Sequence, residues 1–340
     1  FLSVYAKGLV ERVRSAVKAE DYEKPLKGFH IVVDAGNGAG GFYVDRVLQP
    51  LGADTAGSQY LEPDGHFPNH QPNPEDKEAM DSIAACVLRN KADMGIIFDT
   101  DVDRAGAVAT DGKEVNRNRL IALISAVLLE EHPGTTIVTD SITSSGLAAF
   151  ITEKGGVHHR FKRGYKNVID ESIRINKSGK DSQLAIETSG HGALKENFFL
   201  DDGAYLITKL LIKMAQLRRE NRTLFSLIDS LAEPAESAEV RMNILEPDFA
   251  VYGDGVLKNL GDYAAAQGWD VAKENYEGIR VSFGAGEGDG WFLLRMSLHD
   301  PLMPLNIESN SAGGVHKIAE KLYAFLSGYE KLETGGLKGL

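Results

Sequence analysis

The sequence predicts an α/β protein in which two consecutive α/β domains precede a smaller α+β domain at the C-terminus. Through the first two thirds of the chain, short apolar runs ending in turn residues alternate with longer segments of helical periodicity, which is typical of α/β proteins. From residue 239 onward, polar and apolar residues alternate before a helix and three short strands, which indicates a sheet with one more exposed face. A chain of 340 residues is long enough for more than one hydrophobic core.

The first half of the chain opens with an amphipathic helix. In residues 1–24, apolar side chains recur at three- and four-residue steps, and Pro25 ends the helix. The apolar run 29–34 predicts a buried strand that enters a glycine-rich turn at 35–41. The further elements expected in this half are helices over 42–50, 75–90 and 117–131 and strands over 94–98, 105–109 and 136–139.

The second half continues the alternation and then changes it. A basic segment at 158–166 is expected as a loop between helices over 144–154 and 167–175. A strand over 183–186 and a long helix over 202–219 follow. The last third is expected to contain strands over 239–244, 279–283, 290–297 and 303–309 and helices over 249–267 and 311–328. Composition places candidate domain boundaries near 130–134 and 233–239.

The charge and cysteine content exclude several classes of protein. Lys and Arg number 37 against 49 Asp and Glu, a formal net charge of −12, which argues against general binding to nucleic acid or to anionic membranes. The single cysteine, Cys86, excludes a disulfide framework and fits a reducing compartment. The sequence contains no run of eighteen apolar residues, so it predicts no membrane-spanning helix. The chain begins with Phe1, so we expect a processed or truncated product.

The turn at 36–41 matches the G-x-G-x-x-G pattern of dinucleotide-binding folds, and Asp54 lies near the distance of the acid that such folds use. Glycines at a strand-to-helix turn also occur for steric reasons alone. The Glu62-Pro63-Asp64 segment interrupts the strand–helix–strand unit that a dinucleotide site requires. Dinucleotide binding is therefore retained only as the weakest alternative.

Three aspartates follow the apolar strand 94–98 at alternating positions. Asp99, Asp101 and Asp103 can converge on one hard cation, and Mg²⁺ prefers oxygen ligands. An EF-hand loop would need glycine where Arg104 stands and an acid where Thr110 stands, so that interpretation fails. The remaining alternative is a solvated acidic loop stabilised by Arg104.

Three further segments carry polar side chains suited to a sugar phosphate. Glu187, Ser189 and His191 follow the strand 183–186 and offer partners for sugar hydroxyls, whereas no G-x-S-x-G elbow of a serine hydrolase surrounds Ser189. The segment 158–166 is a cationic patch in an acidic protein, and its Gly164 would let a phosphate approach the main chain. Arg295 and Ser297 lie at the end of the apolar run 291–294 and could hold an anion. The alternatives are a glycine-rich turn and solvated loops.

Taken in order, these segments resemble those of the α-D-phosphohexomutase family, which includes phosphoglucomutase, phosphomannomutase and phosphoglucosamine mutase. Residues 99–104 resemble its magnesium loop, D-G-D-G-D-R, and Gly164-Tyr165-Lys166 resembles its G-F/Y-K segment. Residues 187–191 resemble its sugar-binding E-x-S-G-H loop, and 295–301 occupy the place of its phosphate-binding R-P-S-G-T-E-P loop. The turn at 34–41 has a family counterpart as well, which accounts for the glycines without a dinucleotide.

The resemblance implies a domain organisation. Residues 1–26 look like the connector helix out of a first domain, 27–133 like the second, metal-loop domain and 134–238 like the third, sugar-binding domain. Residues 239–330 look like the fourth, phosphate-binding α+β domain, and 331–340 form a tail. The family's first domain, which carries the phosphorylated serine, is expected to be missing, because no T-A-S-H-N-P-like segment occurs in these 340 residues.

The resemblance also implies roles for the site residues. Asp99, Asp101 and Asp103 would hold Mg²⁺, while Arg104 and Lys166 would be catalytic. Substrate binding would fall to Gly164, Glu187, Ser189 and His191, and Arg295 with Ser297 would bind phosphate. Thr100 and Val102 replace glycines of the metal loop, and Leu298, His299 and Asp300 replace Gly, Thr and Glu of the phosphate loop. The leucine crowds an approaching phosphate.

Two functions of different class follow from this resemblance. The first is an isomerase of carbohydrate metabolism, a phosphohexomutase fragment that is inactive alone because its nucleophile is absent and that could associate with the missing first domain. The second is a non-catalytic relative that binds sugar phosphates. The expected ligand is a hexose phosphate in both cases, with no nucleic acid and no membrane as partner. The expected compartment is the cytoplasm or, by similarity to plant members of the family, the plastid stroma.

Overall fold

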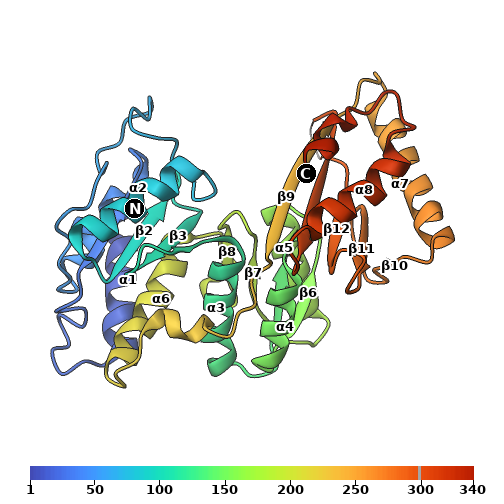
Figure 1. Ribbon diagram of the computed structural model, residues 1–340. Helices are drawn as coiled ribbons and strands as arrows, with labels where there is room; N and C mark the ends of the chain where they lie inside the picture. The colour runs from blue at the N-terminus through green and yellow to red at the C-terminus, as the bar shows by residue number, and fades with distance from the viewer. Residues whose placement is uncertain (298–299) are drawn as a thin grey trace. The chain divides into compact units, whose positions relative to one another are not determined.

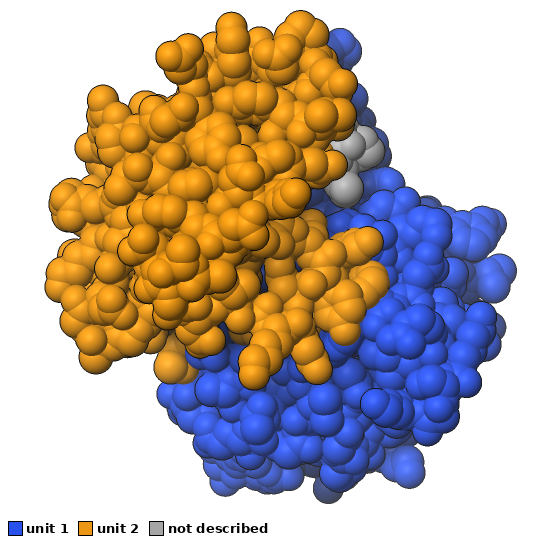
Figure 2. Space-filling model, turned by 90° about the vertical axis from the view of Figure 1, so that its right-hand side faces the viewer, with its two compact units in different colours: residues 1–159, 163–231 blue, residues 160–162, 232–340 orange. Residues whose placement is uncertain are grey.

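The computed structural model describes residues 1–297 and 300–340. It contains two compact units, which Figure 2 colours separately. The first comprises residues 1–159 and 163–231, and the second comprises residues 160–162 and 232–340. None of the helices in the described ranges combines the length and hydropathy that a membrane span requires.

The first sheet of the N-terminal unit has the order β1-β2-β3-β4. β1 (Ile31–Asp34) pairs in parallel with β2 (Met94–Phe98), and β2 continues antiparallel to β3 (Ala105–Ala109) and β4 (Glu114–Val115). Helix α2 (Lys77–Asn90) begins at Asp76, whose carboxylate accepts the N–H groups of Glu78 and Ala79. Its apolar residues pack on one face of this sheet. The polar loop after β2 therefore lies at the carboxyl end of a fully buried strand.

The second sheet has the order β6-β5-β7-β8. Its strands are β5 (Thr136–Thr139), β6 (Val157–Arg160), β7 (Ser182–Ile186) and β8 (Gly192–Leu194), and its connecting helices are α4 (Ser145–Glu153) and α5 (Tyr165–Lys177). β5 and β7 are parallel, whereas β7 and β8 are antiparallel. The turn from β7 to β8 holds residues 187–191, so the sheet presents this loop at the carboxyl end of β7.

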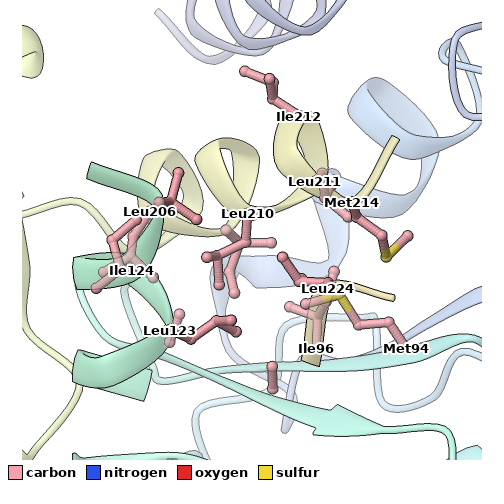
Figure 3. Packing of buried hydrophobic residues seen from close by; sticks show 14 of the residues in the cluster. Met94, Ile96, Leu123, Ile124, Leu206, Leu210, Leu211, Ile212, Met214 and Leu224 are labelled. Atoms are coloured by element: carbon pink, nitrogen blue, oxygen red, sulfur yellow. The ribbon is translucent and has the colours of Figure 1, made fainter. Parts of the chain in front are cut away.

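One hydrophobic core joins the two sheets of the N-terminal unit. Helix α6 (Gly203–Arg218) is buried along nearly its whole length and packs against α1 (Leu2–Val17) and α3 (Arg117–Glu131). Figure 3 shows the α6 side chains of Leu210 and Met214 on the side of the helix that faces Met94 and Ile96 of β2. Because α6 lies on elements of both sheets, the loops of residues 99–104 and 187–191 are held in one packed body.

The C-terminal unit is an antiparallel sheet covered by two helices. Its strand order is β10-β11-β12-β13-β9. The strands are β9 (Glu236–Asn243), β10 (Asp270–Val271), β11 (Ile279–Phe283), β12 (Gly290–Leu294) and β13 (Leu302–Ser309). Alternate residues of these strands pack with α7 (Phe249–Ala266) and α8 (Gly314–Leu326) in a separate core. Ribbon colours from yellow-orange to red mark this unit in Figure 1.

The predicted fold class is confirmed, and several elements occur as predicted, including β2, β3, β5, β11 and α3. Three local predictions are wrong. The helix at the N-terminus ends at Val17, where Lys18 takes a left-handed conformation, and not at residue 24. The helix expected over 42–50 is a 3₁₀ turn at 39–41 followed by a π-helical turn at 44–48. The segment 157–160, expected as part of a loop or its flank, is strand β6.

Candidate functional site

The loop of residues 99–104 folds around the carboxylate of Asp99. This side chain is buried, and its Oδ1 accepts the N–H groups of Val102 at 3.0 Å and Arg104 at 3.1 Å. The Nε of Arg104 donates to Asp99 Oδ2 at 2.9 Å, which gives the buried carboxylate a cationic partner. Val102 has φ = 72°, a conformation that is strained for a β-branched residue. A glycine in place of Val102, as in the D-G-D-G-D-R motif that this loop resembles, would relieve the strain.

The three aspartates of this loop lie close to one another. One oxygen each of Asp99, Asp101 and Asp103 lies within 4.8 Å of the others. Asp103 Oδ1 is buried, and no hydrogen-bond donor reaches it among the described residues. Burial raises the pKa of Asp99 to about 6, while the nearby imidazole of His191 lowers the pKa of Asp103. Asp103 Oδ1 does lie 3.8 Å from the Nε of Arg104. Three converging carboxylates, one with a buried oxygen that accepts no hydrogen bond from the described residues, fit a hard divalent cation such as Mg²⁺.

The second part of the site is the turn of residues 187–191 between β7 and β8. Glu187 is buried, and its Oε1 accepts the N–H of Gly164 at 2.6 Å. Gly164 has φ = 115° and precedes the first residue of α5, so the turn before that helix approaches Glu187 through the main chain. Burial, together with the nearby carboxylate of Asp140, raises the pKa of Glu187 to about 7. This side chain can therefore accept or donate a hydrogen bond near neutral pH.

His191 ends the 187–191 turn and faces the loop of residues 99–104. Its Nδ1 is 2.8 Å from Ser189 Oγ, its Nε2 is 3.6 Å from Asp103 Oδ2, and its ring stacks on Tyr165 with centroids 5.3 Å apart. Burial alone would lower the pKa of His191, but the carboxylates of Asp103 and Asp201 outweigh it and raise the pKa. The imidazole therefore favours the cation and links the metal loop to the sugar-loop side chains.

Main-chain contacts fix the two loops against each other. Arg104 and His191 form an isolated antiparallel bridge, and Ala105 N–H donates to the carbonyl of Gly190 at 3.4 Å. A side chain on Gly190 would place its Cβ 2.7 Å from the carbonyl oxygen of Ala105, and Gly190 has φ = 99°. A Cβ on Gly203 would lie 2.8 Å from the carbonyl carbon of Arg104. These glycines allow an approach that no larger residue permits.

The glycine-rich turn after β1 supports the metal loop. Ala39 N–H donates to the carbonyl of Thr100 at 2.8 Å, and a Cβ on Gly38 would come within 2.8 Å of the same oxygen. A Cβ on Gly40 would lie 2.9 Å from the ring of Phe98. The chain's own atoms therefore occupy the space beside these glycines, which explains the motif without a dinucleotide.

The structure places Lys166 apart from the other predicted residues. Its exposed ammonium group pairs with the carboxylate of Asp170 on the next turn of α5, which raises the pKa of Lys166. Arg163 lies on the inner side instead, with its Nη2 3.6 Å from Glu75 Oε1 and its Nε 3.9 Å from Asp140 Oδ2. In this conformation, Arg163 is the cation of this segment that faces the acidic groups around Glu187.

Two acidic residues that the sequence analysis did not select belong to the site. Asp140 is buried and accepts the hydroxyl of Thr188 at 2.7 Å. Asp201 accepts the N–H of Gly192 at 3.0 Å, and burial raises its pKa to about 7. The position of Asp140 directly after a buried strand was an available signal, because ligands bind at the carboxyl ends of parallel strands. No comparable signal marked Asp201.

The predicted phosphate residues lie in the C-terminal unit. Arg295 follows β12, is buried, and donates through Nη1 to the carbonyl of Met296 at 3.3 Å. Ser297 Oγ accepts the N–H of Asp300 at 3.3 Å. Leu298 and His299 lie outside the described residues.

Comparisons of sequence and of structure with known proteins match this chain to the same group of proteins. The model for phosphoglucomutase/phosphomannomutase alpha/beta/alpha domain II matches residues 4–112, and the model for domain III matches residues 116–234. The phosphomannomutase/phosphoglucomutase of Pseudomonas syringae is 32% identical over 297 residues, covering 87% of this chain and 60% of that protein. A crystal structure of a family protein from Burkholderia thailandensis superposes with a TM-score of 0.77 at 28% identity, covering 95% of this chain and 64% of the other.

A more distant likeness shows the fold alone. The N-acetylphosphoglucosamine mutase of Aspergillus fumigatus, solved in complex with GlcNAc-6P and magnesium, has a TM-score of 0.59 at 13% identity, covering 94% of this chain and 65% of that chain. The present chain spans about 60% of the length of the curated relatives that it matches, such as the Pseudomonas syringae protein.

Proposed function

The chain belongs to the phosphoglucomutase/phosphomannomutase family, and on that basis we propose that it supplies the metal-, sugar- and phosphate-binding parts of a phosphohexomutase. Such an enzyme interconverts hexose 1-phosphates and 6-phosphates through a phosphoserine. The observation that carries the proposal is the main-chain bridge between Arg104 and His191, which joins the acidic loop and the 187–191 loop into one site.

We assign the metal-binding role to the three aspartates of the acidic loop. Asp99, Asp101 and Asp103 would hold Mg²⁺, and the bound ion would offset the charge of a phosphoryl group during transfer. The Nε of Arg104 donates to Asp99 and so orients this carboxylate, and its Nη1 donates to Asn73 Oδ1 at 3.4 Å. The remaining N–H groups of the two terminal nitrogens could contact a phosphate. The planar guanidinium of Arg104 suits a bidentate contact with phosphate oxygens.

The hydroxyl groups of the sugar would be bound by the 187–191 loop. Glu187 has a pKa near neutrality and presents a carboxyl group that can accept from a hydroxyl, and Ser189 adds a second polar partner. Neighbouring carboxylates raise the pKa of His191, whose Nε2 faces Asp103 and can hold or release a proton. Lys166 would need to leave Asp170 to reach a transferring group, so Arg163 is the nearer cation in the present conformation.

The test is hexose phosphate binding by the 340-residue chain. We expect glucose 1-phosphate to bind with millimolar affinity, on the order of −4 kcal/mol, in titration calorimetry. Glu187→Gln and Arg295→Gln should each weaken binding, because the first replaces one of the two carboxylate acceptor oxygens with an amide donor and the second removes a buried cation. Asp21→Asn is the matched control, since Asp21 is an exposed acid in a bend outside the site, where its Oδ1 accepts the N–H of Lys24. Binding that is insensitive to both site variants would overturn the proposal.

A second candidate, a non-catalytic sugar-phosphate-binding protein, is favoured by one sequence observation. Leu298 and His299 stand where the family motif has Gly and Thr, so the phosphate loop departs from the mutase pattern. The double substitution Leu298→Gly with His299→Thr separates the two. Tighter binding of glucose 1-phosphate indicates a mutase site, whereas unchanged or weaker binding indicates that this pair serves another ligand.

A further inference from the structure

A cavity of about 400 Å³ lies in the N-terminal unit, away from the candidate site. Asp93 at its wall and Asp99 in the metal loop stand at opposite ends of β2, which puts them roughly 20 Å apart along the strand. Helix α6 shows the same separation, because Gly203 contacts the metal loop while Arg218 lines the cavity. The cavity is therefore distinct from the metal and sugar loops.

The floor of this cavity is apolar. Phe29, Met214 and Leu224 are buried there, and Phe225 is partly exposed toward the opening. Figure 3 shows Met214 and Leu224 beside Met94 of β2, so the floor rests directly on the main core. A rigid floor with aromatic side chains and a volume of this size suits a ligand of one or two rings.

The charged side chains at the rim of the cavity differ in whether they have a polar partner. Asp93 Oδ2 accepts the N–H of His30 at 2.8 Å, Asp111 Oδ1 accepts that of Lys113 at 3.0 Å, and Arg222 pairs with Glu220 at 3.2 Å. No hydrogen bond or ion pair reaches the guanidinium of Arg218 in residues 1–297 and 300–340. Its contact is the face of the Phe29 ring, 4.3 Å from its Cζ. A guanidinium stacked in this way keeps its edge available for an anion.

We propose that this cavity binds a small planar aromatic monoanion, with its ring on the floor of Phe29, Met214 and Leu224 and its acid group on Arg218. The two aspartates at the rim disfavour a second negative charge by Coulomb repulsion. The site therefore selects an aromatic carboxylate and rejects a dianion such as a hexose phosphate, which separates it from the candidate sugar-phosphate site.

The experiment uses the whole chain and 2-naphthoate as the probe in titration calorimetry. We expect saturable binding with one equivalent, and no competition by glucose 6-phosphate. Arg218→Gln should weaken binding about tenfold, because a charge-assisted hydrogen bond is lost. Arg219→Gln, which changes an exposed neighbour that does not line the cavity, should leave the affinity unchanged.

Two further variants keep the result unambiguous. Thr110→Trp adds a large side chain at the exposed rim without removing a core contact, and it should abolish binding by filling the opening. Asp101→Asn alters the metal loop and should leave 2-naphthoate binding intact. This variant therefore distinguishes a failure of the proposed sugar-phosphate function from a failure of the cavity to bind its ligand. The proposal would be overturned if the unmodified chain did not bind 2-naphthoate. It would also be overturned if the Arg218→Gln and Thr110→Trp variants bound it as tightly as the unmodified chain does.

Discussion

The main chains of Arg104 and His191 pair directly, although 87 positions separate them in sequence. Arg104 ends the acidic loop after β2, and His191 ends the turn after β7, so the pairing joins the first sheet to the second. The same contact brings His191 Nε2 to 3.6 Å from Asp103 Oδ2. An electrostatic link between the two loops therefore depends on how closely their backbones approach.

Gly203→Ala should destabilise the fold by about 2 kcal/mol, because the added methyl group overlaps the main chain of Arg104 and forces the metal loop to move. Chemical denaturation would measure this loss. Gly8→Ala is the matched control, since Gly8 also lies in a helix but has open space around it; it should stabilise the chain by roughly 0.5–1 kcal/mol. Equal effects of the two substitutions would show that the loops are not tightly packed.

Glu187→Gln should stabilise the chain at high pH. The pKa of Glu187 is about 7 in the folded chain against 4.5 for an unperturbed glutamate, so the folded state loses stability as pH rises from 4.5 through 7. Below pH 4.5 the carboxyl group is protonated in both states, and the contribution vanishes. The variant should therefore gain on the order of 2 kcal/mol at pH 8 and little at pH 4.5.

Denaturation of both proteins across this pH range is the measurement. Gln keeps an acceptor for the N–H of Gly164, so the comparison isolates the charge. A gain that is the same at pH 4.5 and pH 8 would mean that Glu187 titrates normally.

The fold could largely be predicted because its strands are short apolar runs between turn residues, as β2 and β5 illustrate. β6 escaped prediction, because Val157-His158-His159-Arg160 reads as a polar loop. It lies at the edge of its sheet, where polar side chains remain partly exposed. The turns at 39–48 failed for another reason, since helical periodicity does not distinguish 3₁₀ and π geometry from an α-helix.

The candidate site was predictable where residues of one role stand together in sequence. Asp99, Asp101 and Asp103 share one loop, and their convergence follows from that loop's closure around Asp99. Asp140 and Asp201 come from separate segments, and only tertiary packing brings them to Thr188 and Gly192. Lys166 occupies the predicted motif, yet its i,i+4 pairing with Asp170 on α5 depends on helix geometry that the motif does not encode.

The pure 340-residue chain should not convert glucose 1-phosphate into glucose 6-phosphate, because no T-A-S-H-N-P-like segment is present to carry the phosphoryl group. A coupled assay for glucose 6-phosphate tests this, with a full-length mutase of the family as the positive control. Turnover that disappears on changing a serine within these 340 residues would contradict the assignment of the missing nucleophile.

Mg²⁺ should bind weakly, with a dissociation constant in the millimolar range, since three carboxylates in one loop supply the protein ligands. Calorimetry should detect this binding in the unmodified chain and lose it in Asp101→Asn. Asp111→Asn, also an exposed acid in a turn, should bind as the unmodified chain does. If all three proteins bind equally or none binds, the acidic loop is a solvated turn.

The central claim, that the metal loop and the 187–191 loop form one site, is tested most directly by paramagnetic broadening. Mn²⁺ would be titrated into the chain while the ring protons of its histidines are followed by NMR. The account predicts that His191 broadens first, that His30, beside Asp93 at the opposite end of β2 from the metal loop, broadens far less, and that Asp101→Asn suppresses the broadening. A His191 signal that stays sharp, or that broadens equally in Asp101→Asn, would contradict it.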